Sequence, residues 1–124
     1  MKIAVPAKGM TKADMADDRF GRAAYYVIYD SETKEVYGVE NTAKDEVSGA
    51  GGQAVRLLDK EGVKVTLVPE VGPKALQAFK AFDIKAYTYG KDMTVEAAIE
   101  EYEAGKLQIV ETESHDGHHG LRRA

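Results

Sequence analysis

The segment Ser48-Gly49-Ala50-Gly51-Gly52 carries more chemical information than any other short stretch of this 124-residue chain. It stands directly before residues with helical periodicity. Glycines there let the backbone turn tightly and point N–H groups outward, and the helix dipole adds partial positive charge, so the combination suits an anion. The segment is not a Walker A loop and does not match G-x-G-x-x-G. It indicates either a backbone site for an anion or a connection that needs glycine for its geometry alone.

Two arginines flank an aromatic residue and a glycine in Arg19-Phe20-Gly21-Arg22. Guanidinium groups in this arrangement can clamp an anionic ligand by forked hydrogen bonds and stacking. The alternative is that Arg19 and Arg22 pair with the neighbouring Asp17 and Asp18 on a solvated loop. The segment is therefore a candidate anion site only if the fold brings it beside the glycines.

The three histidines of the chain, His115, His118 and His119, lie close together near its C-terminus, with Asp116 between them. Imidazoles with a nearby carboxylate can hold zinc, nickel, copper or iron. Two glycines in the same stretch argue against an ordered helix there. The histidines are candidate metal ligands on a tether, and the alternative is a tail that binds metal only adventitiously.

Residues for catalysis are scarce. The chain has no cysteine, which excludes a thiol nucleophile, a disulfide scaffold and a cluster held by the protein's own thiolates. Ser114 and His115 are sequence neighbours and form no supported triad. A nuclease of ribonuclease-H-like architecture needs a carboxylate in its first strand, and residues 2–6 contain none. We therefore predict a protein that is not an enzyme.

The composition is that of an ordinary globular domain, with 44% hydrophobic and 31% charged residues. Seventeen basic residues against 21 acidic ones give a net charge of −4, the wrong sign for a protein that grips a nucleic-acid backbone with its whole surface. No apolar run approaches the roughly 20 residues that span a bilayer. Residues 1–6 are too short and too quickly polar for a signal peptide. We expect a small, soluble, cytoplasmic protein with no membrane or nucleic-acid partner.

Hydrophobic patterning predicts the elements that must position these candidates. Apolar and β-branched residues predict an early series of strands, and helical periodicity alternates with strands afterwards. The expected strands cover residues 2–6, 25–30, 35–40, 63–68 and 84–89, and the expected helices cover residues 52–61, 73–82 and the stretch between Thr94, as N-cap, and Gly105. We expect one domain over residues 1–107 and a flexible tail over residues 108–124.

This order predicts an α/β fold with a mixed five-stranded sheet, in the order 3-2-1-4-5 and with only strand 2 antiparallel. Strands 1, 3, 4 and 5 then end at the same rim, where open sheets bind ligands. The loops 7–23, 41–52, 69–73 and 90–93 gather at this rim. Gly72, in the third of them, opens a helix and either supplies further N–H donors or simply separates a strand from a helix.

An ordered set of short motifs resembles a known family. The motifs are Lys2-Ile3-Ala4-Val5-Pro6, Arg19-Phe20-Gly21-Arg22-Ala23, Ile28-Tyr29-Asp30, Glu40-Asn41, Gly49-Ala50-Gly51, Gly62-Val63, Gly72-Pro73 and Thr94-Val95-Glu96-Ala97-Ala98-Ile99, with Tyr102 and Gly105. Over roughly residues 1–107, the chain is similar to the dinitrogenase iron–molybdenum cofactor biosynthesis family, which includes NifX-like proteins and the C-terminal domain of NifB-type enzymes. The resemblance implies a ribonuclease-H-like three-layer α/β/α fold without nuclease activity. It also implies that the protein binds or carries an iron–sulfur or iron–molybdenum cofactor, or its precursor, in a context related to nitrogen fixation.

These observations support two hypotheses for the same rim. In the first, the protein carries an anionic metal–sulfur cluster between cofactor-assembly proteins, and the histidines His115, His118 and His119 contribute ligands; the residues expected to hold the cluster are Arg19, Arg22, Ser48, Gly49, Ala50, Gly51, Gly52 and Gly72. In the second, the rim of a regulatory or interaction module binds a phosphorylated small molecule or a partner protein. The expected third strand lies at a sheet edge, where two copies of a chain can pair. Under both hypotheses we therefore expect a monomer or a weak homodimer.

Overall fold

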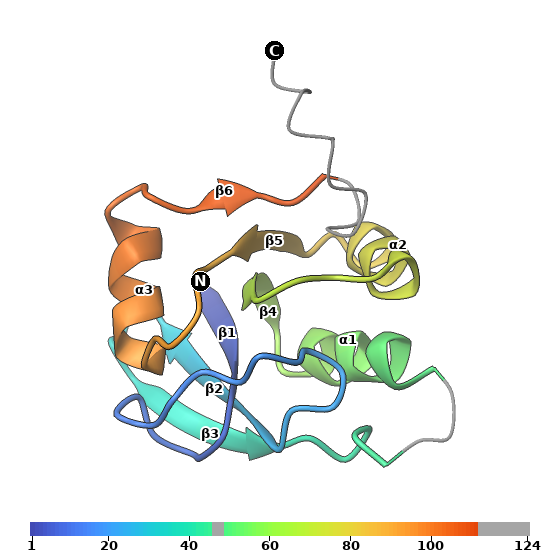
Figure 1. The fold of residues 1–124 in the computed structure, drawn as a ribbon, viewed down its shortest axis with the longest axis horizontal. Helices are drawn as coiled ribbons and strands as arrows, with labels where there is room; N and C mark the ends of the chain where they lie inside the picture. The colour runs from blue at the N-terminus through green and yellow to red at the C-terminus, as the bar shows by residue number, and fades with distance from the viewer. Residues whose placement is uncertain (46–48, 112–124) are drawn as a thin grey trace.

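Six strands and three helices form the part of the chain that the computed structural model describes, residues 1–45 and 49–111 (Figure 1). The elements follow one another as β1 (Lys2–Ala7), β2 (Tyr25–Asp30), β3 (Val36–Glu40), α1 (Ala50–Lys60), β4 (Val63–Val68), α2 (Pro73–Ala81), β5 (Lys85–Thr88), α3 (Val95–Glu103) and β6 (Gln108–Ile109). None of the helices in these residues is long and apolar enough to cross a membrane.

The strands form a single sheet in the order β3-β2-β1-β4-β5-β6. Strand β2 runs antiparallel to both of its neighbours, and β4 and β5 run parallel to β1. The predicted mixed α/β class and the predicted order of the first five strands are thus confirmed. Strand β3 lies at one edge, as expected.

The prediction of five strands is wrong because a sixth, β6, pairs antiparallel with β5. Its two residues lie beyond residue 107, in the part of the chain assigned to the tail. Two residues are too few to show an alternating pattern, so this strand can be recognised only from its pairing with β5. The strand is held by the register of Ile109 opposite Tyr87 and by the N–H of Val110, which donates to the carbonyl of Ala86 at 2.7 Å.

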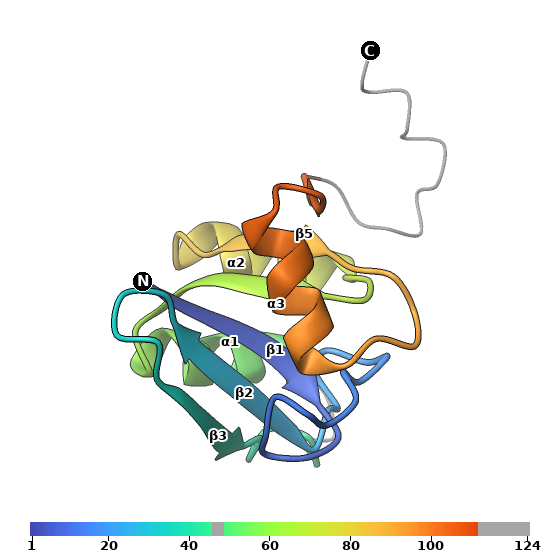
Figure 2. The ribbon, with the colours of Figure 1, turned by 90° about the vertical axis from the view of Figure 1, so that its left-hand side faces the viewer.

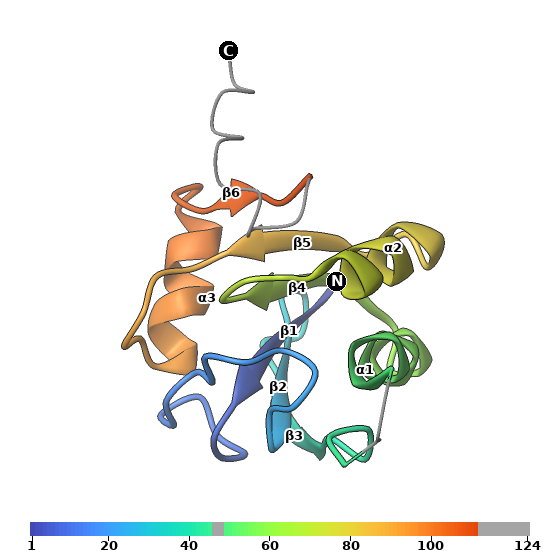
Figure 3. The same ribbon diagram turned by 45° about the vertical axis from the view of Figure 1, so that its right-hand side comes forward.

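Helices lie on both faces of the sheet. On one face, α1 and α2 pack over a cluster that includes Tyr26 and Ile28 of β2 (Figure 3). On the other face, α3 packs over Val5 and Val27 (Figure 2). The strand residues alternate between the two clusters because successive side chains of a strand point to opposite faces. The carboxyl ends of β1, β4 and β5 therefore lie between two helical layers, at the rim where α1 and α2 begin.

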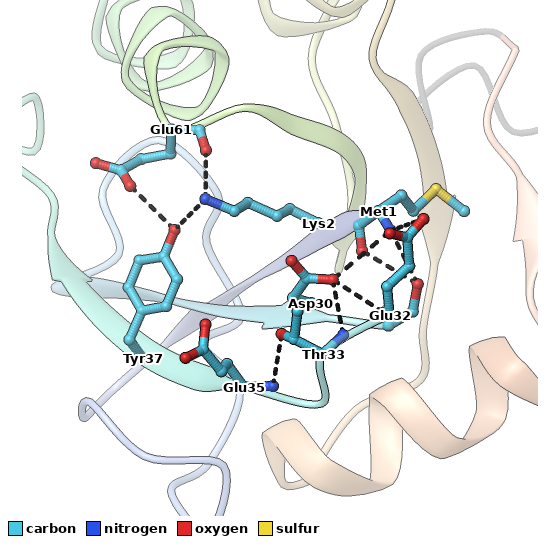
Figure 4. A network of polar contacts seen from close by, with 9 residues as sticks. Met1, Lys2, Asp30, Glu32, Thr33, Glu35, Tyr37 and Glu61 are labelled. Carbon is cyan, nitrogen blue, oxygen red and sulfur yellow. Dashed lines mark hydrogen bonds and ion pairs between the residues drawn. The ribbon is translucent and has the colours of Figure 1, made fainter.

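The opposite rim is closed by a polar network (Figure 4). The ammonium group of Lys2 donates to the Tyr37 hydroxyl at 3.0 Å and to the carbonyl of Glu61 at 3.1 Å, and the Tyr37 hydroxyl donates to the Glu61 carboxylate at 3.1 Å. The bond to Tyr37 raises the pKa of Lys2. This network joins the start of β1, the edge strand β3 and the end of α1, so it stabilises the frame at this end of the sheet.

Candidate functional site

An open hollow of about 450 Å³ lies at the rim where β4 ends and where α1 and α2 begin. We call it the rim hollow. Its lining comes from three segments that are far apart in the sequence: the turn after residue 19, the start of α1 and the loop into α2. The lining residues are Phe20, Gly21, Arg22, Ala50, Gly51, Glu70, Val71, Gly72, Pro73, Lys74 and Ala75.

Among the described residues, no side chain caps the start of either helix that opens on the rim hollow. Helix α1 is preceded by Gly49 and helix α2 by Gly72, and neither first turn contains an acidic residue. The first N–H groups of a helix have no partner within the helix, and they give its start a partial positive charge. Two such starts therefore lie at one hollow, although Pro73, the first residue of α2, has no N–H to donate.

Close packing explains part of the glycine pattern. A side-chain carbon on Gly21 would lie 2.9 Å from the backbone nitrogen of Gly51, and one on Gly51 would lie 3.3 Å from the Cβ of Ala75. Gly49 has a φ of 75°, which other residues rarely adopt. The steric interpretation of the glycine-rich segment therefore holds at Gly49 and Gly51, and Gly21 is required for the same close approach.

Packing does not explain the other two glycines of the predicted site. Apart from the chain neighbours and the helix backbone, no atom of the described residues lies within 4 Å of a side-chain carbon built on Gly52 or Gly72, and neither glycine has a positive φ. Gly72 has an ordinary extended conformation, with φ −85° and ψ 175°. A side chain at Gly72 would stand in open space beside the rim hollow, so the absence of one keeps the backbone of the α2 start accessible.

The side-chain charge around the rim hollow is mixed but net positive. Arg22 and Lys74 contribute two cations and Glu70 one carboxylate. The Arg22 guanidinium also donates to the carbonyl of Lys44 at 2.6 Å, which ties it to the turn after β3.

Arg19 lies outside the lining of the rim hollow. Its backbone N–H and its Nε both donate to one oxygen of Asp17, at 3.0 and 3.3 Å, and that carboxylate raises the pKa of the Arg19 guanidinium. Asp17 is only 2% exposed, whereas the Arg19 side chain is 62% exposed. The pairing weighed as the alternative for both arginines is thus observed between Arg19 and Asp17.

The structure brings together Arg22, Ala50, Gly51 and Gly72 from the predicted site and adds Lys74 and Glu70, for which the sequence had given no reason. The position of Lys74 in the first turn after Gly72-Pro73 is the signal that could have indicated it. Ser48 and the histidines His115, His118 and His119 lie outside the described residues. Within the residues described, no group of three or more histidine or carboxylate side chains could hold a metal ion.

A smaller hollow of about 160 Å³ opens beside the first one and shares Glu70 with it. Its floor includes Tyr89, whose hydroxyl donates to the backbone carbonyl of Asp17 at 2.6 Å. Burial raises the pKa of this hydroxyl, which therefore remains a donor. The charged residues around this hollow are mostly acidic, so it is less suited to an anion than the rim hollow: Lys8, Asp17, Asp18, Glu70, Lys91 and Asp92.

Comparison with known proteins gives consistent matches. A family model described as dinitrogenase iron-molybdenum cofactor matches residues 1–105. The uncharacterized protein MJ0580 of Methanocaldococcus jannaschii is 30% identical over 114 residues, which cover 90% of this chain and 92% of that protein.

Two solved structures are also similar. The apo form of the orange protein from Desulfovibrio gigas has a TM-score of 0.87 and 35% identity, and the match covers 90% of this chain and 94% of that one. A NifB candidate from Thermotoga, assigned to the DUF35 family, has a TM-score of 0.79 and 35% identity over the same shares.

Proposed function

Because the chain belongs to the dinitrogenase iron-molybdenum cofactor family, we propose that it is a non-enzymatic protein that binds and carries an anionic iron–sulfur or iron–molybdenum cofactor, or a precursor of one. The observation that carries the proposal is the rim hollow, where two uncapped helix starts meet beside Arg22 and Lys74. The resemblance that names the cargo and the geometry that suits an anion are independent of each other.

The physical argument is electrostatic. Backbone N–H groups at a helix start bind anions, and charge-assisted hydrogen bonds from arginine are among the stronger ones available to a protein. The chain contains no cysteine, so no thiolate of its own can bond to the cluster iron. A non-covalent site of this kind releases its cargo readily, which is what a carrier requires.

The same chemistry supports a second ligand class. N–H groups at helix starts recognise charge rather than metal, so a phosphorylated small molecule is the alternative occupant of the rim hollow. Stabilisation of the protein by nucleotides and not by clusters, in a thermal-shift screen, would favour that alternative.

We also assign the fold to the ribonuclease-H-like three-layer class, in support of which helices lie on both faces of the sheet (Figures 2 and 3). For the domain organisation we propose a single domain that holds the whole sheet, so that it includes β6 beyond the expected boundary at residue 107. A binding role fits this fold here because β1 contains no carboxylate that could hold a catalytic magnesium ion.

The test is an anaerobic titration of the metal-free protein with isolated iron–molybdenum cofactor, followed by gel filtration and measurement of co-eluting iron. A double variant, R22A/K74A, is compared with a control, R56A/K60A, which removes the same two charges from α1 outside the lining of the rim hollow. Each charged hydrogen bond lost should cost roughly 1.5–3 kcal/mol, or about 10- to 100-fold in affinity.

Selective loss of co-elution in R22A/K74A would support the proposal. Equal losses in both variants would show that binding depends only on the net charge of the protein. Absence of co-elution with the wild-type protein would refute it. A chain ending at residue 111 completes the set, because weaker binding by it would assign a contribution to the segment that contains the histidines.

A further inference from the structure

Asn41 is a fully buried polar residue immediately after β3. A buried amide is costly unless it is hydrogen-bonded, and this one is satisfied on both sides. Its Nδ2 donates to the carbonyls of Gly21 at 2.9 Å and Ala23 at 2.8 Å, and its Oδ1 accepts from the N–H of Ala43 at 3.0 Å. All three bonds go to loop residues rather than to a strand, so Asn41 joins the turn at residues 20–23 to the turn that follows β3.

A second buried group holds the other end of the 20–23 turn. The hydroxyl of Tyr26 donates to the carbonyl of Phe20 at 2.5 Å, and Tyr26 is completely buried. Burial raises the pKa of this hydroxyl, so it remains a donor at any ordinary pH. The ring of Phe20 in turn packs edge-on against Phe79 of α2, with 5.1 Å between ring centroids.

The turn held in this way touches the rim hollow directly. Gly21 packs against Gly51 in the first turn of α1, so closely that no side chain fits between the two backbones. Arg22, the next residue, lines the hollow and donates back to the carbonyl of Lys44. A shift of the turn by a few tenths of an ångström must therefore move a cation and the neighbouring helix start together.

From these contacts we infer that Asn41 is a positioning residue of the rim hollow, acting through the 20–23 turn to fix Arg22 against the start of α1. This inference rests on the proposed function, because that function supplies the ligand of the rim hollow. It extends that proposal to a residue that is not among those that line the hollow. Tyr26 has the same role at the opposite end of the turn.

The positioning role is tested first without any ligand, by NMR of the full chain. N41A removes both donor bonds to the turn, and Y26F removes one hydroxyl while keeping the ring. We expect the backbone N–H signals of Gly21 and Gly51 and the Nε–H signal of Arg22 to shift or broaden in both variants. The control is I99A, which makes a cavity on the opposite face of the sheet under α3, where Ile99 is buried; its changes should stay on that face.

A double-mutant cycle then links the position of the turn to binding of isolated iron–molybdenum cofactor. N41A alone should lower the affinity about tenfold, the effect of one charge-assisted hydrogen bond that is no longer aligned. In the R22A background the same substitution should cost less than about threefold, because the group that it positions is already gone. In the R56A background it should cost the full tenfold.

Unchanged signals of the 20–23 turn in the folded variants would overturn the positioning role, and so would full additivity of N41A and R22A. If N41A does not fold, Y26F takes its place in both measurements, since it deletes a single oxygen. Absence of cofactor binding by the wild-type chain would instead overturn the proposed function, and the ligand-free NMR measurement distinguishes this failure from the first.

Discussion

Gly72→Asp should make the protein more stable and its binding site weaker. Gly72 already has the backbone conformation of a helix N-cap, and apart from its chain neighbours no described atom lies within 4 Å of a side-chain carbon built there. An aspartate oxygen can accept from the N–H of Lys74 or Ala75, which lack partners within the helix. Capping, the helix dipole and the lower entropy of the unfolded chain each add a few tenths of a kcal/mol or more, so the free energy of unfolding should rise by about 1 kcal/mol.

The same substitution should remove most of the affinity for an anion. The new carboxylate takes up donors that a ligand would use, and it places a negative charge at the edge of the rim hollow. At a separation of about 5 Å and an effective dielectric constant of about 20, repulsion from a single negative charge amounts to roughly 3 kcal/mol. The affinity should therefore fall by more than about 100-fold.

The two effects are measured separately, by urea unfolding and by anaerobic titration with isolated iron–molybdenum cofactor. G72A is the matched control, because it adds a side chain without a charge or an acceptor, and G72S adds the capping oxygen without the charge. Binding should fall in the order wild type, G72S, G72D. Wild-type affinity in G72D would place the ligand elsewhere, and a loss of stability in G72D would contradict the open geometry at the start of α2.

Three further predictions concern the frame around the site. Gly21→Ala should lower the free energy of unfolding by about 1–3 kcal/mol in urea unfolding, since its Cβ would lie 2.9 Å from the backbone nitrogen of Gly51; stability equal to that of the wild type would contradict the close approach. The Tyr37 hydroxyl raises the pKa of Lys2 above its ordinary 10.5, so the stabilisation from Lys2 is complete below that pH and is lost as the pH rises through the folded value. The free energy of unfolding, measured by urea unfolding at a series of alkaline pH values, should therefore fall less steeply with rising pH in Lys2→Met than in the wild type. Backbone N–H groups of the following turn lower the pKa of Asp30 below its ordinary 3.8, so its contribution is present above that pH and is lost as the pH falls further. Thermal unfolding between pH 5 and pH 2 should show a weaker acid dependence for Asp30→Asn.

Local patterns were enough to predict most of the elements and their order. Alternation and helical periodicity are properties of short stretches, and the turn residues that bound them act locally too, as at Thr94, whose hydroxyl accepts from the N–H of Ala97 at 3.1 Å. The arrangement of the first five strands followed from the handedness of crossovers. Strand β6 was missed because two residues have no period and because its pairing depends on the edge of β5.

The residue types of an anion site, glycines before a helix and nearby arginines, were visible in the sequence. Their separate roles were decided only by tertiary contacts. Arg19 and Arg22 are equivalent by composition, yet one pairs with Asp17 and the other lines the rim hollow. Gly51 and Gly72 are the same residue type, yet Gly51 is packed against Ala75 and Gly72 faces open space.

The physical reason is that secondary structure depends on interactions within a few residues, whereas a site at a sheet rim is assembled from loops that meet only when the sheet forms. The amide of Asn41 reaches the carbonyl of Gly21 across 20 positions of sequence. No local pattern predicts a bond of that kind. The sequence alone thus determined most of the elements, the order of the first five strands and the family. The tertiary structure added β6 and decided which side chains share one hollow and what holds them there.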